Sequence, residues 1–235
     1  MRGFRPIAEI QYLDYLMFAL QTLSDDLATV SYRSVGKQLA PLIVRTRGHR
    51  LEGMWHAGSP MGMILNSLKG MLVLTPRNMV QASGMYNTLM SCTDPALIIE
   101  PLNAYRLKEK EPLNLGEFTV PLGKIEIINP GTDITVVSYG STLKLVEKTI
   151  PELQRNNINI ELIDIQSLIP FDLNKDIVES IKKTNKLLIV DEDYPGGASS
   201  FILKVLIEDH NGFKYLDSKP ITCLLYTSPS PRDLY

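Results

Sequence analysis

The sequence has 235 residues, a formal net charge of −2 and a pI near 6.0. This length suffices for one large or two ordinary domains with real cores. The near balance of acidic and basic residues, which are scattered along the chain, argues against a general nucleic-acid-binding surface. The two cysteines, Cys92 and Cys223, lie far apart, form no metal-ligand pattern and favour a reducing compartment. No apolar run is long enough for a membrane span.

Residues 1–100 alternate short apolar strands with helices. The expected strands are a buried one at the end of 5–10, then 41–44, 71–74 and 96–100. A helix is expected over 12–27, because its apolar residues share one face: Leu13, Leu16, Met17, Leu20, Leu23 and Leu27. A second helix follows Pro76. This alternation predicts a parallel sheet with crossover helices. The abrupt start suggests that further residues precede Met1.

A second unit follows a change of pattern. Residues 101–121 are charged, contain prolines and lack periodicity, which indicates a linker. Beyond it, strands are expected at 133–140, 158–163 and 186–191. Helices are expected at 141–153, 172–183 and 198–208, with Asp172 capping the second. This order predicts a small doubly wound α/β domain over 122–222.

Two polar segments fall outside this pattern. Asp191-Glu192-Asp193 follows a strand, and we interpret it as a solvated turn. Residues 223–235 are rich in turn and disorder formers, resemble translated sequencing-adaptor sequence, and are expected to be a non-native tail.

The segment 48–60 places the only Trp and two of the three His among glycines. Ser59-Pro60 is typical of an N-cap followed by a first-turn proline, so His56 is expected on a loop just before a helix. A His there suits acid–base work near neutral pH, although a packed loop with a hydrogen-bonded His is the simpler interpretation. Arg47 and His49, at the mouth of this segment, fit either a solvated turn or a contact to a substrate carboxylate or a lipoyl domain.

Several segments occur together in an order that is specific to one family. They are 9–15 (EIQYLDY), 32–34 (YRS), 44–45 (VR), His56, 116–124 (GEFTVPLGK), 134–140 (ITVVSYG) and 163–172 (IDIQSLIPFD). From Met1 to Thr222 the chain resembles the beta subunit of the thiamine-diphosphate-dependent 2-oxo acid dehydrogenases. The resemblance implies a partial pyrimidine-binding domain over 1–100, then a transketolase C-terminal-like domain over 122–222.

The resemblance also implies a reaction and a set of site residues. The reaction is oxidative decarboxylation of a 2-oxo acid on thiamine diphosphate, with acyl transfer to a lipoyl group. The residue matching His56 serves acyl transfer as a proton donor. The residue matching Tyr15 packs against the aminopyrimidine, and Gln11 matches a polar residue of the same pocket. Where the family usually has Ser-Gln after the His, this chain has Ala57-Gly58.

The remaining parts of the reaction are assigned to partners. The chain has no Gly-Asp-Gly…Asn motif, so the resemblance places Mg²⁺ and the diphosphate mainly on an alpha-type subunit or a fused alpha region. The family's glutamate that activates the pyrimidine lies upstream of the motif containing Gln11, ahead of Met1. Further implied partners are a lipoyl acyltransferase core and a second beta chain in an α2β2 assembly, with neither nucleic acid nor membrane. The fragment alone is expected to be inactive.

Several alternatives stay open. Within the resemblance, the amino-acid sequence of residues 9–15 favours a branched-chain substrate, with pyruvate next. Transketolase and deoxyxylulose-phosphate synthase share both domains, and a non-catalytic dimerisation or acyltransferase-docking fragment is a third alternative. The expected location is the cytoplasm in bacteria or the mitochondrial matrix in eukaryotes.

Overall fold

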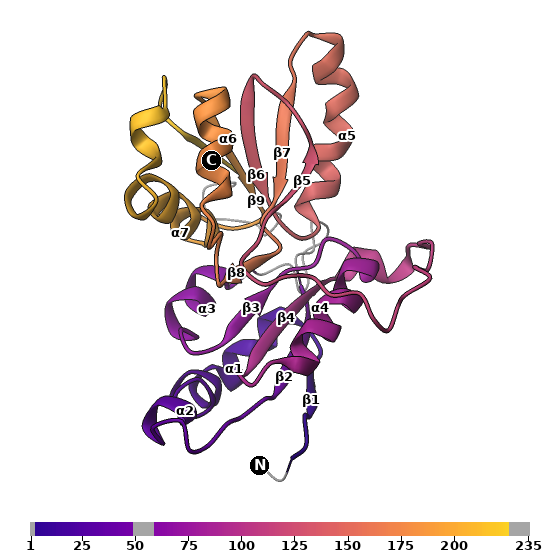
Figure 1. Ribbon diagram of the computed structural model, residues 1–235, viewed down its shortest axis with the longest axis vertical. Helices are drawn as coiled ribbons and strands as arrows, with labels where there is room; N and C mark the ends of the chain where they lie inside the picture. Colours follow the sequence, from indigo (N-terminus) through magenta and orange to yellow (C-terminus); the bar gives the residue numbers. More distant parts are fainter. Residues whose placement is uncertain (1–2, 49–58, 226–235) are drawn as a thin grey trace, which may run out of the picture.

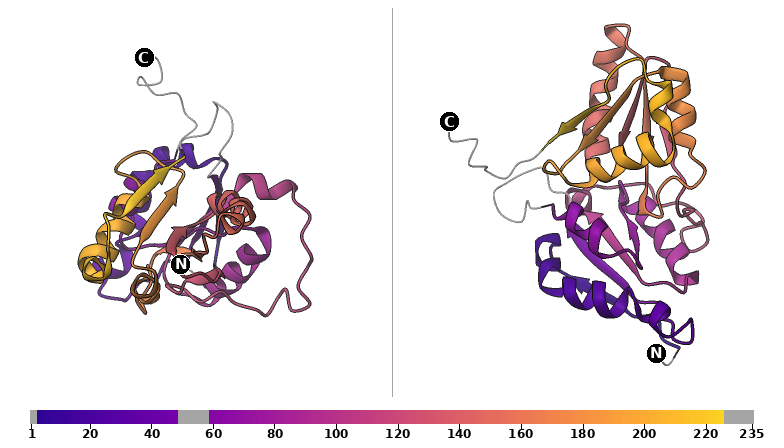
Figure 2. Two further views of the ribbon diagram at one scale, coloured as in Figure 1. Left: turned by 90° about the horizontal axis from the view of Figure 1, so that it is seen from above. Right: turned by 90° about the vertical axis from the view of Figure 1, so that its left-hand side faces the viewer.

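The computed structural model describes residues 3–48 and 59–225, which form two α/β units stacked end to end (Figure 1). Each unit is built on one five-stranded sheet with helices on both faces (Figure 2). The predicted α/β class with two sheets is therefore confirmed. Within these described ranges, no helix combines the length and hydrophobicity needed to cross a membrane.

The first sheet has the strand order β1-β2-β4-β3-β8, parallel except for β8. Its strands are β1 (Ile7–Ile10), β2 (Ile43–Gly48), β3 (Leu72–Leu74), β4 (Ala96–Pro101) and β8 (Ser167–Ile169). The central strand β4 is buried along its whole length, as its apolar sequence predicts. Strand β1 is an exposed edge instead of the expected buried strand, and its Ile7 is 52% exposed.

Helices cover both faces of this sheet. They are the 3₁₀ helix η1 (Leu13–Tyr15), α1 (Leu16–Gln21), the π-helix η2 (Thr22–Leu27), α2 (Val30–Arg33), α3 (Met61–Ser67), α4 (Met79–Ser91) and the 3₁₀ helix η3 (Leu102–Arg106). The helix expected over 12–27 is thus one helical run of three geometries. Leu13, Leu16 and Leu23 are buried as predicted, whereas Met17 is 58% exposed. Leu13 and Leu16 belong to the main core together with side chains of α3, while α4 packs on the opposite face.

The second sheet has the order β10-β9-β6-β7-β5, with only β5 antiparallel to its neighbour. Its strands are β5 (Glu126–Asn129), β6 (Ile134–Ser138), β7 (Ile160–Asp164), β9 (Leu187–Asp191) and β10 (Ile221–Leu224). Its helices are α5 (Thr142–Arg155), α6 (Asp176–Thr184), α7 (Ala198–Lys204), the π-helix η4 (Val205–Asp209) and the 3₁₀ helix η5 (Gly212–Tyr215). The Asp172 carboxylate accepts from the amides of Asp176 and Ile177, so it caps α6 as predicted. The helix itself begins later than predicted, at Asp176, and Lys175 occupies the N-cap position.

Three features of this half differ from the sequence prediction. Strand β5 was not expected. Strand β10 continues through Cys223 and Leu224 beside β9, so the fold extends beyond the predicted end at Thr222. Strand β8 follows β7 in the chain but pairs with β3 of the first sheet. The chain passes from the second sheet to the first at Gln166, because the backbone of this residue has a φ of 57° and turns the chain between β7 and β8.

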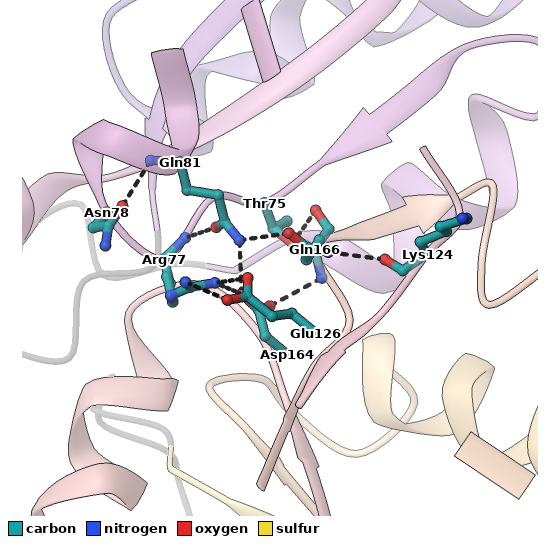
Figure 3. Close-up of polar contacts among 8 residues, drawn as sticks. All are labelled: Thr75, Arg77, Asn78, Gln81, Lys124, Glu126, Asp164 and Gln166. Carbon is teal, nitrogen blue, oxygen red and sulfur yellow. Dashed lines mark hydrogen bonds and ion pairs between the residues drawn. The ribbon is translucent and has the colours of Figure 1, made fainter. Parts of the chain in front are cut away.

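A buried polar network joins the two units beside β8. Figure 3 shows Arg77 and Gln81 of the first unit facing Asp164 and Gln166 of the second. The Arg77 guanidinium lies 2.8 Å from the fully buried Asp164 carboxylate, which also accepts from the Gln81 amide at 3.0 Å. Glu126 binds the same guanidinium from its exposed side. The network therefore fixes the second sheet against the loop that precedes α4.

Replacing Arg77 should destabilise the whole chain. Arg77→Met leaves Asp164 buried without its cation, and removal of one partner of a buried pair costs about 3–5 kcal/mol in the free energy of unfolding. Denaturant unfolding measures this loss. The matched control is Arg33→Met, since Arg33 and its partner Asp26 are both exposed and such pairs contribute about 0–1 kcal/mol. Equal losses in the two variants would contradict the assigned role of Arg77.

The Arg77→Met variant should also change its response to pH. Burial raises the pKa of the Asp164 carboxyl from its usual 3.8, and Arg77 opposes this rise. Without Arg77, the folded variant holds a proton that the unfolded chain releases. Its stability, relative to that of the unsubstituted chain, should therefore recover as the pH falls from neutral toward the usual carboxyl pKa of 3.8. A pH-independent difference between the two proteins would contradict this explanation.

Candidate functional site

The candidate site lies where three neighbouring parallel strands end. Gln11 follows β1, the segment 49–58 follows β2, and η3 follows β4. Ligands of open α/β sheets usually bind outside the carboxyl ends of the strands. Of the sequence-predicted site residues that the structure describes, Gln11 and Tyr15 therefore follow a strand at the edge where a ligand is expected.

Two of the three predicted site residues are described, and they share one turn. Gln11 is exposed just after β1, and Tyr15, the last residue of η1, is 40% exposed. Leu13 and Leu16 between and beside them are 1% exposed, so the turn is anchored by its apolar residues. The third predicted residue, His56, lies outside the described residues, as does His49.

The helix after the glycine-rich segment begins later than predicted. Helix α3 starts at Met61, and Pro60 occupies the N-cap position instead of the first turn. The Ser59 hydroxyl, which was expected to cap the helix, is buried and makes no hydrogen bond to the part of the chain that the structure describes. The predicted capping role of Ser59 is therefore wrong.

A charged network supports the site from one face of the sheet. The Glu100 carboxylate, on a residue that is 1% exposed, accepts from Arg45 at 2.7 Å and from the Tyr86 hydroxyl at 2.6 Å, and it also binds the Tyr105 hydroxyl. Arg45 reaches across to Glu9 at 3.1 Å. The buried Glu100 carboxylate of β4 therefore links β2, α4 and η3, and Arg45 extends this link to β1 through Glu9.

The pKa shifts in this network favour a structural role over proton transfer. The hydrogen bond to Glu100 raises the pKa of Arg45 above its already high usual value. Burial, assisted by Glu100, raises the pKa of both Tyr86 and Tyr105 well above the usual 10.0. The two hydroxyls and the guanidinium thus remain donors at any physiological pH. The sequence pattern alone does not indicate a role for Glu100, Tyr86 or Tyr105. The available signal was opposite charges at the ends of two apolar segments, Arg45 after 41–44 and Glu100 after 96–99.

The acidic run after β9 is buried, which overturns the predicted solvated turn. Asp191, Glu192 and Asp193 are each at most 3% exposed. Asp191 accepts from the Tyr139 hydroxyl and the Ser199 amide, and Asp193 accepts from the Ala198 amide. These carboxylates cap the first turn of α7, where negative charge is favourable.

A cleft of about 420 Å³ lies between the two units, beside the carboxyl ends of β3, β4 and β6. Its lining includes Arg77, Asn103, Ser141, Lys144 and Lys148. Two of its three cations already have carboxylate partners, because Arg77 binds Asp164 and Lys144 lies 3.5 Å from Glu109. Among the residues that the structure describes, no group of three or more His, Cys, Asp or Glu side chains is placed to hold a metal ion.

Comparisons with known proteins first define the class of the fold. The family described as "Transketolase, C-terminal domain" matches residues 123–234. A solved "Split gene transketolase, inactive beta4 tetramer" superposes with a TM-score of 0.71, covering 97% of this chain and 68% of that chain at 16% identity. The protein thus has the two-sheet α/β fold of a transketolase-type chain.

Sequence relatives then define the family. The pyruvate dehydrogenase E1 component subunit beta of Acholeplasma laidlawii is 30% identical over 94% of this chain and 67% of its own length. The 2-oxoisovalerate dehydrogenase beta subunits of Bacillus subtilis and Chaetomium thermophilum are 29% and 30% identical, covering 64% and 50% of their own lengths. The chain belongs to the family of E1 beta subunits of the 2-oxo acid dehydrogenases. It spans about half to two thirds of the length of these relatives.

The Arg45 guanidinium binds two carboxylates, those of Glu100 and Glu9, and we expect them to contribute differently to stability. Glu100→Gln should lower the free energy of unfolding by about 1–3 kcal/mol, because Arg45 and two tyrosine hydroxyls lose a buried charged acceptor. Glu9→Gln is the matched control, because Glu9 binds Arg45 from a side chain that is 51% exposed, and it should cost less than about 1 kcal/mol. Urea unfolding of both variants measures this difference. An equal cost would show that burial of Glu100 is not what makes it important.

Proposed function

We propose that this chain is the beta-type component of a thiamine-diphosphate-dependent 2-oxo acid dehydrogenase. The observation that carries the proposal is the position of Gln11 and Tyr15, in a member of the E1 beta family, on one anchored turn at the carboxyl edge of the first sheet. The reaction is oxidative decarboxylation of a 2-oxo acid, followed by acyl transfer to a lipoyl group.

The exposed groups at this edge fit a flat heterocycle. The Tyr15 ring, 40% exposed, offers an aromatic face for packing. The Gln11 side chain, also exposed, offers an amide with both donors and an acceptor. We propose that these two side chains hold the aminopyrimidine of thiamine diphosphate. When bound, the cofactor supplies the carbon nucleophile and the electron sink for loss of carbon dioxide.

We assign the diphosphate and Mg²⁺ to an alpha-type partner, since the chain lacks a Gly-Asp-Gly…Asn motif. The surface beside the site supports such a partner. Phe18 and Met17 on α1, close in sequence to Tyr15, are 91% and 58% exposed. Large exposed apolar side chains next to a site are typical of a subunit contact. The proposed further contacts are a second beta chain and the lipoyl acyltransferase core.

His56 is proposed as the proton donor for acyl transfer to the lipoyl sulfur, because a neutral-pH imidazole suits that step. For the 2-oxo acid we propose a branched-chain substrate first and pyruvate second, following the spelling of residues 9–15. Relatives of both kinds are similar at 29–30% identity, so their names favour neither substrate.

Cofactor binding should require the partner. Titration calorimetry with thiamine diphosphate and Mg²⁺ should give no tight binding to this chain alone, and saturable binding once an alpha-type subunit is added. The physical reason is that the diphosphate and the metal carry most of the charge to be recognised, and we assign both to the alpha-type partner because the sequence lacks the Gly-Asp-Gly…Asn motif. Tight binding by the isolated chain would contradict the divided site.

The Tyr15 ring should matter for cofactor affinity within the assembly. Tyr15→Ala should weaken thiamine diphosphate binding by about tenfold, because an aromatic packing partner is lost. Tyr32→Ala is the matched control, since Tyr32 is 89% exposed on α2. If both variants bind like the unsubstituted assembly, Tyr15 does not contact the aminopyrimidine.

His56→Ala should separate two activities of the assembled enzyme. Decarboxylation coupled to an artificial electron acceptor should be spared, while lipoyl acylation falls by about 10²–10⁴-fold, the usual range for loss of a general acid. His49→Ala, in the same segment, provides the comparison. Equal loss of both activities, or no loss, would remove the role assigned to His56.

A further inference from the structure

Arg47 is the charged residue of β2 that binds the proposed cofactor turn, residues 11–15. It lies next to the last residue of β2, directly opposite Glu100 of β4 in the strand register. Its Nε donates to the Gln11 carbonyl oxygen at 2.9 Å. The end of β2 is thus bonded to the first residue after β1.

The Arg47 guanidinium also lies between two aromatic rings. Its central carbon is 4.8 Å from the Tyr12 ring centroid and 5.8 Å from the Tyr105 ring centroid. Both distances are within the range of a cation–π contact. The Tyr12 ring in turn meets the Tyr15 ring edge to face, with centroids 6.0 Å apart and an interplanar angle of 83°. A continuous line of contacts therefore runs from Arg47 through Tyr12 to Tyr15.

Arg47 differs from its neighbour Arg45 in the groups that its guanidinium contacts. Arg45, on the same face of β2, uses its guanidinium to bind Glu9 and Glu100. Arg47 forms no ion pair with any carboxylate in the described part of the chain. Its interactions are directed instead to the Gln11 carbonyl and the Tyr12 ring of the turn 11–15, and to the Tyr105 ring of η3. This turn carries both residues to which we assign the aminopyrimidine.

We propose that Arg47 is a positioning residue for cofactor binding. It fixes the Gln11 backbone directly and the Tyr15 ring through Tyr12, so that the aminopyrimidine meets a preformed surface. Preorganisation of this kind improves affinity by removing the cost of ordering the turn on binding. The inference rests on the proposed function of Gln11 and Tyr15, and it assigns to Arg47 a role in affinity rather than in the chemical step.

The test uses the assembly of this chain with an alpha-type subunit, thiamine diphosphate and Mg²⁺. Arg47→Met should raise the Kd for thiamine diphosphate by about tenfold, the effect expected from losing one hydrogen bond and one cation–π contact. At saturating cofactor, kcat and the KM for the 2-oxo acid should stay within about twofold of the unsubstituted assembly. Arg47→Lys keeps a cation and a donor, and should restore the Kd to within about threefold.

A double-mutant cycle tests the path through Tyr12. Tyr12→Leu and Arg47→Met should each weaken cofactor binding, and the double variant should bind no more weakly than the poorer single variant, because both break the same line of contacts. Arg33→Met, which removes an exposed arginine on α2, is the control. Thermal unfolding of each variant identifies any general loss of folding. If Arg47→Met does not fold, Tyr12→Leu carries the test, since it should also raise the Kd and an unchanged Kd would contradict the inference.

The outcomes separate this inference from the proposed function. If the unsubstituted assembly binds no thiamine diphosphate, the proposed function is wrong. If it binds the cofactor and Arg47→Met binds equally well, Arg47 is not a positioning residue. A raised KM for the 2-oxo acid with an unchanged cofactor Kd would overturn the inference as well, because it would place Arg47 on the substrate carboxylate.

Discussion

The structure depends on the buried ion pair between Arg77 and Asp164, which fixes one sheet against the other. A carboxylate that is fully buried is costly unless donors surround it, and here the guanidinium of Arg77 and the amide of Gln81 supply them. Strand β8 reinforces the junction, since it belongs to the second half of the sequence but pairs with β3 of the first sheet. The two units are therefore interlocked instead of being joined by a linker alone.

The junction and the candidate site lie at the same edge of the first sheet. Arg77 follows β3. The parallel strands beyond β3 in the first sheet, which are β4, β2 and β1 in that order, have their carboxyl ends along the same edge. The Glu100 carboxylate links the elements at this edge by accepting hydrogen bonds from Arg45, Tyr86 and Tyr105. The turn that carries Gln11 and Tyr15 follows β1 at this edge, and Arg47 links it to β2. The candidate site thus combines a buried charged network with an exposed turn.

The sequence predicted the elements well and their pairing poorly, for a physical reason. Apolar runs and their spacing determine local strands and helices, so β4, α4 and the cap at Asp172 were foreseen. The exchange of β8 depends on contacts between distant segments, which no local pattern reports. The acidic run at 191–193 appeared solvated because its donors come from Tyr139 and from the first turn of α7. Gln11 and Tyr15 are proposed as site residues through family resemblance, whereas the contacts that Arg47 makes to Gln11 and Tyr12 could be known only from the fold.

The most direct test of this account is a crystal structure of the assembly of this chain with an alpha-type subunit, Mg²⁺ and thiamine diphosphate. The account predicts that the aminopyrimidine ring packs against the Tyr15 ring, with the Gln11 amide within hydrogen-bond distance and Arg47 still bonded to the Gln11 carbonyl. An aminopyrimidine bound away from the turn 11–15 would contradict it, whatever the activity of the assembly.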